Sequence, residues 1–230
     1  MRRSEINRIL RESAAFLERM GCRLPPFSQW SPGDWRRKGP ECREIVQQGL
    51  GWDVTDFGSG DFAKYGLVLF TLRNGTVDGA SRGGKTYAEK IMAVREGQVT
   101  PTHFHFSKME DIINRGGGKL AIQLWNSDER EGLMDTDVAV SVDGVRRTVS
   151  AGGMIVLERG ESVCLTQRLY HKFWGKEGAG TVMVGEVSQV NDDRTDNRFL
   201  ESLPRFSEIV EDEPPLRVLC NEYARYYTMP

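Results

Sequence analysis

Hydrophobic and polar positions follow two different periods along the chain, a helical one near the start and strand-like alternation later. Between residues 4 and 20, apolar side chains recur every three or four positions, which predicts an amphipathic helix. Ser4 is the expected N-cap of this helix, and Gly21 is its expected end. Segment 24–40 is rich in proline, glycine and tryptophan, so we expect an ordered but irregular arm there. A short second helix is expected at 41–48.

From about residue 65 the sequence consists of short, mostly alternating segments separated by turn residues. The expected strands are 66–72, 85–95, 119–125, 138–142, 145–149, 154–157, 162–165 and 181–187. Asn74-Gly75 is a turn signal that ends the first of them, and Asp143-Gly144 fits the two-residue turn of a hairpin. Many short strands with regular turns predict an all-β fold, either an antiparallel sandwich or a barrel.

We expect a single domain over residues 1–230. Within it, residues 1–64 are expected to form the N-terminal helix and arm, and residues 65–190 the barrel core. Residues 191–230 are polar at first and aromatic at the end, so we expect an irregular C-terminal segment that covers the barrel.

Composition and charge narrow the functional classes. The 230 residues are 39% hydrophobic and 28% charged, which is ordinary for a soluble globular protein. A formal net charge of −2 provides no basic field for nucleic acid or an anionic membrane. No apolar run approaches the roughly 18 residues that span a bilayer, and we expect no secretory signal at the N-terminus. The four cysteines are widely spaced, so we expect free thiols and a cytoplasmic location.

All three histidines of the chain fall into one pattern with a carboxylate: His103, His105, Glu110 and His171. In a strand, residues two apart point to the same face, so His103 and His105 can reach one ion. Three imidazoles and one carboxylate suit a divalent transition metal and leave positions for substrate or water. The sequence therefore predicts a metal centre.

The parity of these positions adds a structural requirement. Glu110 is even-numbered, so a continuous strand would place it on the face opposite His103 and His105. A turn or bulge near residues 106–107 must therefore reset the register. After that reset, Lys108 should face the same interior as Glu110.

The spacing of these residues resembles the first motif of the cupin superfamily, in which Gly97 precedes the two histidines and Gly117 follows the carboxylate. Residues 153–160 followed by His171 loosely resemble the second motif, without its usual proline-glycine segment. The resemblance implies an all-β cupin fold, a jelly-roll β-barrel with the metal inside, here with an N-terminal helix and irregular cover segments at both ends.

Segments 87–92, 102–118 and 186–198, together with the N-terminal helix, resemble the D-lyxose ketol-isomerase family of bacterial sugar isomerases. The resemblance covers essentially the whole chain. It implies an Mn²⁺-dependent conversion of D-lyxose to D-xylulose, often with D-mannose to D-fructose as a second activity. It also implies a homodimer, with a monosaccharide as the small-molecule partner.

Isomerisation of an aldose needs acid–base groups near the metal, because protons or hydrogen must move between C1 and C2 and between O1 and O2. Lys108 and Glu186 are the candidate catalytic residues. Lys90, Asp193 and Arg205 are candidate substrate-binding residues, and Lys90 is also an alternative acid–base group.

Two other functions remain open at this stage. The same donor set can hold Fe(II) in a cupin dioxygenase, and the aromatic residues near the ligands would suit its apolar substrate. The chain could also be a non-catalytic cupin that binds a sugar. The lysines and carboxylates favour a polyhydroxylated substrate and hence the isomerase. The sequence fixes neither the preferred sugar epimer nor the metal.

Overall fold

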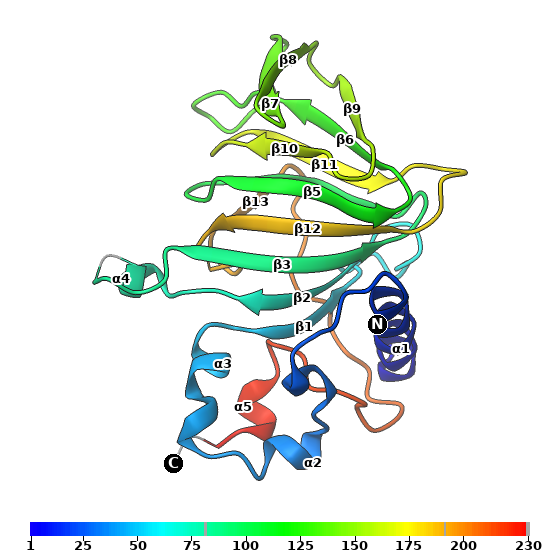
Figure 1. Cartoon of the computed structure of the whole chain (residues 1–230), viewed down its shortest axis with the longest axis vertical. Coiled ribbons are helices and arrows are strands. Elements are labelled where there is room, and N and C mark those ends of the chain that lie inside the picture. Colours follow the sequence, from blue (N-terminus) through cyan, green and yellow to red (C-terminus); the bar gives the residue numbers. More distant parts are fainter. Residues whose placement is uncertain (81, 191, 229–230) are drawn as a thin grey trace.

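Two antiparallel sheets face each other in the computed structural model, which describes residues 1–80, 82–190 and 192–228 (Figure 1). The larger sheet has the strand order β1 (Gly51–Thr55), β2 (Leu67–Arg73), β3 (Tyr87–Val94), β12 (Val182–Gln189), β5 (Glu110–Gly117), β10 (Ser162–Leu165), β7 (Val138–Val142), β8 (Val145–Val149). The smaller sheet has the order β13 (Asn197–Phe199), β4 (Val99–His105), β11 (Tyr170–Gly175), β6 (Leu120–Trp125), β9 (Met154–Leu157). The predicted all-β fold is therefore confirmed.

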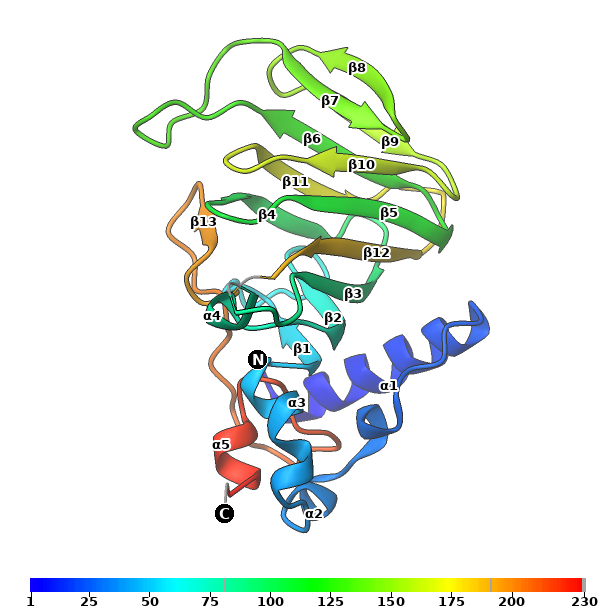
Figure 2. The ribbon, with the colours of Figure 1, turned by 60° about the vertical axis from the view of Figure 1, so that its left-hand side comes forward.

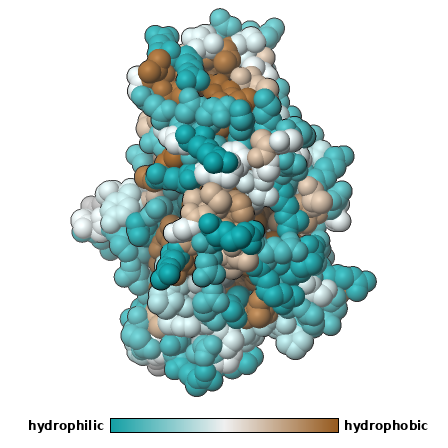
Figure 3. All heavy atoms as spheres, turned by 45° about the vertical axis from the view of Figure 1, so that its right-hand side comes forward, coloured by the Kyte–Doolittle hydropathy of each residue, from teal (hydrophilic) through white to brown (hydrophobic). Residues whose placement is uncertain are grey.

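Apolar side chains from both sheets fill the space between them. Leu69 and Met92 from the larger sheet and Ile122 and Phe173 from the smaller one belong to this inner core. Strands alternate inward apolar and outward polar residues, so each sheet contributes one face to the core. On the side shown in Figure 3, hydrophilic residues predominate and hydrophobic ones form small separate areas.

Helix α1 (Arg3–Arg19) covers the outer face of the larger sheet, alongside β1 and β2 (Figure 2). Its buried stripe of Ile6, Ile9 and Leu10 packs in one cluster with Trp52 and Phe70. Burial of one such aliphatic side chain contributes roughly 1.5–3 kcal/mol, so the predicted amphipathic pattern explains why the helix docks here. Strand β1 is consequently buried on both faces, and it lacks the alternation from which strands were predicted.

The predicted start of α1 is wrong, whereas its predicted end is confirmed. The N-cap is Arg2, and the Ser4 hydroxyl instead donates to Asp212 at 2.7 Å, because the C-terminal segment lies against this end of the helix. At the other end, Gly21 has a φ of 78°, and the amides of Gly21 and Cys22 donate to Glu18 and Leu17. This is a Schellman motif, in which glycine adopts the left-handed conformation without strain.

The arm after α1 is ordered, as predicted, and its tryptophans are packed against the C-terminal segment. The arm contains the short helix α2 (Pro32–Trp35), and two 3₁₀ turns lie in it or at its end, Pro26–Gln29 and Pro40–Cys42. Two further short helices follow along the chain, α3 (Arg43–Gln47) and α4 (Val77–Ala80). Trp35 is 1% exposed and packs on Tyr223 of α5 (Tyr223–Tyr226) and on Tyr227. The helix expected at 41–48 corresponds to α3 and the 3₁₀ turn before it.

All eight predicted strands are present, and the hairpin β7–β8 has the predicted turn. Asp143 and Gly144 have φ values of 50° and 82°, as a type I′ turn requires. Strands β1, β5, β11 and β13 were not predicted, and β4 was expected only as the extended segment that carries His103 and His105. β1 and β13 lie outside the predicted barrel core of residues 65–190, but both pair within the two sheets. The division of the chain into arm, core and cover stays a prediction. No helix among the described residues is long and apolar enough to cross a membrane.

Candidate active site

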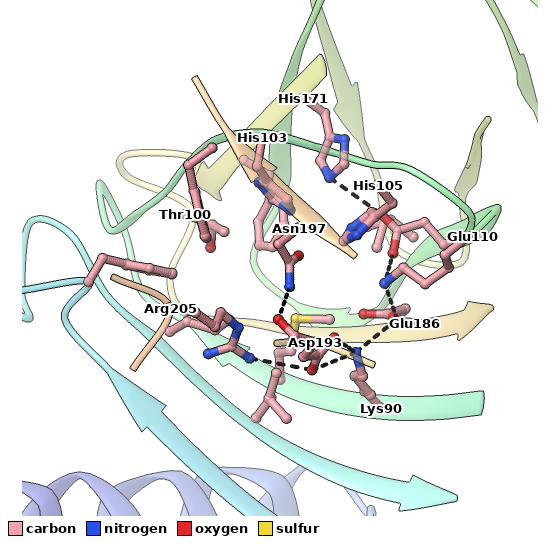
Figure 4. Close-up of a pocket in the computed structure, with 18 residues that line it drawn as sticks. Lys90, Thr100, His103, His105, Glu110, His171, Glu186, Asp193, Asn197 and Arg205 are labelled. Atoms are coloured by element: carbon pink, nitrogen blue, oxygen red, sulfur yellow. Dashed lines mark hydrogen bonds and ion pairs between the residues drawn. The ribbon is translucent and has the colours of Figure 1, made fainter. Parts of the chain in front are cut away.

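The three histidines meet inside the barrel, on two neighbouring strands of the smaller sheet (Figure 4). His103 and His105 lie on β4, and His171 on β11 pairs directly with His103. All three are buried, and one ring nitrogen from each lies within 4.8 Å of the others. Backbone carbonyls of Pro101 and Leu169 accept hydrogen bonds from Nδ1 of His103 (2.7 Å) and His171 (3.0 Å), which leaves Nε2 of both rings free to bind an ion.

Glu110 reaches the same point from the opposite sheet. The chain turns at residues 106–109 and enters the larger sheet with Glu110 as the first residue of β5, so the reset required by side-chain parity is present. Oε1 of Glu110 lies 3.4 Å from Nε2 of His105 and 3.3 Å from Nε2 of His171. Neighbouring ligands of an ion with bonds of about 2.1 Å are separated by about 3 Å, so this spacing fits a divalent metal.

The unsatisfied polar atoms of the site also fit a metal. Nε2 of His171 is buried and has no hydrogen-bond partner among the described residues. Burial lowers the pKa of His171 to about 4 and that of His103 well below its usual value, with further lowering from neighbouring imidazoles. Both rings are therefore neutral at pH 7, which is the form that binds a metal.

Lys108 lies between two carboxylates at the edge of the histidine cluster. Its ammonium group is 2.7 Å from Oε2 of Glu110 and donates to Oε1 of Glu186 at 2.8 Å. Burial alone would lower the pKa of Lys108, but Glu110, Glu186 and Asp193 raise it above its usual value. Lys108 is therefore a buried cation directed to the interior, on the side that the parity argument predicts.

From Glu186 a row of alternating charges continues along the pocket (Figure 4). Lys90 on β3 lies 3.4 Å from Glu186 of β12 and donates to both oxygens of Asp193, at 3.0 and 3.1 Å. Nη2 of Arg205 then contacts Asp193 at 3.5 Å and Asp53 at 2.6 Å. Burial alone would raise the pKa of Asp193, but Lys90 and Arg205 hold it well below its usual value. Asp193 is therefore negatively charged at neutral pH.

One pocket is lined by all of the predicted site residues. They are His103, His105, Glu110, His171, Lys108, Glu186, Lys90, Asp193 and Arg205. Apolar side chains such as Phe57, Met92 and Phe173 complete the wall. A concave site with a few converging polar and charged groups suits a small polar molecule.

The pocket also contains polar residues that the sequence analysis missed. Asn197 on β13 and Thr100 on β4 line it, and Asp53 supports Arg205 from behind. Oδ2 of Asp196 lies 3.7 Å from Nδ1 of His105, slightly beyond hydrogen-bond distance. Asp196 and Asn197 fall in the segment 186–198 that carried the family resemblance, whereas Thr100 has the parity of an outward-facing residue and left no signal in the sequence.

Comparison with known proteins places the chain in a family. The family model described as D-lyxose isomerase matches residues 1–223. A D-lyxose/D-mannose isomerase of Serratia proteamaculans is 54% identical over 227 residues, with 98% of this chain and 99% of the relative covered. Another from Escherichia coli O157:H7 is 51% identical, with 98% and 100% covered.

Solved structures share the fold at much lower identity. An L-ribose isomerase of Geodermatophilus obscurus superposes with a TM-score of 0.60 at 15% identity, over 91% of this chain and 98% of that one. An unliganded L-ribose isomerase of Cellulomonas parahominis gives the same TM-score, identity and coverage. The resemblance found in the sequence is confirmed, and the chain belongs to the D-lyxose isomerase family, a family of aldose–ketose isomerases.

Proposed function

We propose that this enzyme interconverts D-lyxose and D-xylulose, and also D-mannose and D-fructose, in the pocket between the two sheets. The two relatives above 50% identity are named as isomerases of D-lyxose and D-mannose. The observation that carries the proposal is the union of a three-histidine cluster and a row of buried charges in one pocket. Charged and hydrogen-bonding walls suit a polyhydroxylated substrate better than the apolar substrate of a dioxygenase.

His103, His105, Glu110 and His171 are the residues that would hold the metal, which we propose to be Mn²⁺. A bound divalent ion would polarise the sugar carbonyl and stabilise negative charge on its oxygen. The convergence of Glu110 on two imidazole nitrogens, at 3.4 and 3.3 Å, supports this four-residue assignment.

Glu186 is the group that we propose to move the proton between the two reacting carbons. Its carboxylate would remove the proton from C2 of the aldose and return it to C1, while a second proton passes from O2 to O1. Lys108 donates to Glu186 at 2.8 Å, and its ammonium group would hydrogen-bond the sugar oxygen on which negative charge develops. Ser188 donates to the same Glu186 oxygen at 3.1 Å and helps to fix the carboxylate.

Lys90, Asp193 and Arg205 would bind the remaining hydroxyl groups of the open-chain sugar. They line the pocket and are tied to one another by the ion pairs of Lys90 with Asp193 and of Arg205 with Asp193. A row of ionic groups that is already hydrogen-bonded loses little conformational freedom when a ligand binds, which favours tight and specific recognition.

We also propose a homodimer in the cytoplasm. The resemblance to cupins supports the dimer, and the four free cysteines support a reducing compartment. Light scattering coupled to size-exclusion chromatography tests the dimer, which a monomer mass of 26 kDa in solution would contradict.

The decisive experiment is an anaerobic assay of metal-stripped enzyme restored with Mn²⁺, using D-lyxose and D-mannose and following the ketose by NMR. We expect turnover without oxygen. Consumption of oxygen and dependence on Fe²⁺ would instead indicate a dioxygenase, and saturable sugar binding without turnover would indicate a binding protein. In D₂O, proton transfer through Glu186 predicts deuterium at C1 of the ketose product. Absence of deuterium at C1 would contradict the proposed role of Glu186.

A further inference from the structure

A β-bulge turns Thr100 into the pocket. His103 pairs with His171, and Thr100 pairs with Phe173, so two residues of β4 oppose a single residue of β11 between these pairs. The extra residue inverts side-chain parity on one side of the bulge, and Thr100 and His103 therefore both face inward. Pro101 lies within the bulge, and its carbonyl accepts the hydrogen bond from His103 that orients the imidazole. The same irregularity thus positions a candidate ligand and Thr100.

The hydroxyl group of Thr100 is left without a partner in this position. Thr100 is 3% exposed and lines the pocket, and Oγ1 has no hydrogen-bond partner among the residues that the structure describes. A buried hydroxyl that makes no hydrogen bond costs free energy, so such atoms in a binding pocket are typically matched by the ligand.

A second residue of the pocket wall, Arg205, also has an unsatisfied atom. Nη1 of Arg205 is buried and makes no hydrogen bond within the described part of the chain, whereas Nη2 donates to Asp53 at 2.6 Å. Figure 4 shows Thr100 and Arg205 on the side of His103 that lies away from Glu110. Both residues therefore lie away from Glu110, one of the candidate metal ligands (Figure 4).

We infer that Thr100 is a specificity-determining residue, whose hydroxyl binds a hydroxyl group at the tail of the open-chain sugar together with Nη1 of Arg205. This inference rests on the proposed function, because it takes the C1–C2 end to lie near the metal ligands. The two protein groups are complementary in chemistry, since Thr100 can accept or donate while the guanidinium can only donate. A tail hydroxyl can satisfy both, and Asp53 acts as the positioning residue that holds the guanidinium.

Thr100→Val tests this assignment, because valine keeps the β-branched shape and removes only the hydroxyl. We expect kcat/KM for D-lyxose to fall about tenfold, as when a substrate hydroxyl loses its partner in a buried site. Thr100→Ser should restore most of the activity. Thr102→Val is the matched control, since Thr102 lies on the same strand, lines a different, outer pocket and should leave kcat/KM unchanged.

Substrate analogues separate a specific contact from a general defect. D-Lyxose lacking the hydroxyl at C4 or at C5 removes one tail group at a time, and for one of these analogues wild type and Thr100→Val should give equal kcat/KM. The inference would be overturned if Thr100→Val lowered kcat/KM equally for D-lyxose and both analogues, or lowered it for none of them. Either result would leave the proposed isomerase function standing. A wild-type enzyme that converts neither D-lyxose nor D-mannose would overturn the proposed function and this inference with it.

Discussion

Replacing Arg3 by methionine should destabilise the fold strongly, although Arg3 lies far from the pocket in sequence. Arg3 is 0% exposed and ties α1 to the C-terminal segment. Nε and Nη2 each donate to Glu211 at 2.8 Å, and Nη1 donates to Glu222 at 3.1 Å, while Nη2 also contacts Glu222. The Glu222 side chain is only 5% exposed, so the variant leaves a buried carboxylate without its main cationic partner.

The size of the effect follows from this burial. Removing one partner of a buried ion pair typically costs about 3–5 kcal/mol. For a chain of this length, each kcal/mol lowers Tm by roughly 2–4 °C, so a fall in Tm on the order of 10 °C is expected. Arg8→Met on the same helix is the control. Arg8 pairs with Glu12 at 3.0 Å, but both side chains are about half exposed, and such a pair contributes only about 0.3–0.5 kcal/mol.

Circular dichroism of thermal and urea unfolding, with metal-free protein, measures both variants, because a bound ion would itself shift the apparent stability. The pH dependence adds a second check. Hydrogen bonds from Arg3 lower the pKa of Glu211, so this pair stabilises the fold above the unfolded-state pKa of about 4.3, and the stabilisation is lost as pH falls through the lowered folded value. The difference in the free energy of unfolding between wild type and Arg3→Met should therefore be smaller in acid. An Arg3→Met variant that unfolds like Arg8→Met at pH 7 would refute this reasoning.

Three further predictions concern the site and one turn. Glu186→Gln should lower kcat by about 10²–10⁴-fold in the D-lyxose assay, with metal content unchanged, and near-normal turnover would exclude Glu186 as the base. His171→Ala should lose its ion on dialysis, measured by plasma mass spectrometry, and full retention would contradict the four-residue assignment. Gly144→Ala should cost about 1–2 kcal/mol in urea unfolding, because φ is 82° and the added methyl has no other atom within 4 Å, so conformational strain acts alone. An unchanged midpoint would show that the hairpin turn relaxes.

The candidate site could be assembled largely from sequence because its chemistry is concentrated in rare residue types. The three histidines are the whole histidine content of the chain, and their spacing with Glu110 predicted a convergence that the pocket geometry bears out. Asp53 was missed because it lies in β1, a strand that is buried on both faces and shows no alternation. Its pairing with Arg205 joins positions 152 residues apart, which local patterns do not encode.

The sequence by itself determined the local structure of this protein: the amphipathic stripe of α1, the Asp143-Gly144 turn, the alternation of most strands and the ligand spacing. These depend on backbone preferences and side-chain period, which act over a few residues. Only the tertiary structure decided which face Thr100 takes, since a bulge is defined by the partner strand and cannot be read from β4 alone. It also decided that Lys108 lies between Glu110 and Glu186, because those carboxylates come from two strands that only sheet pairing brings together.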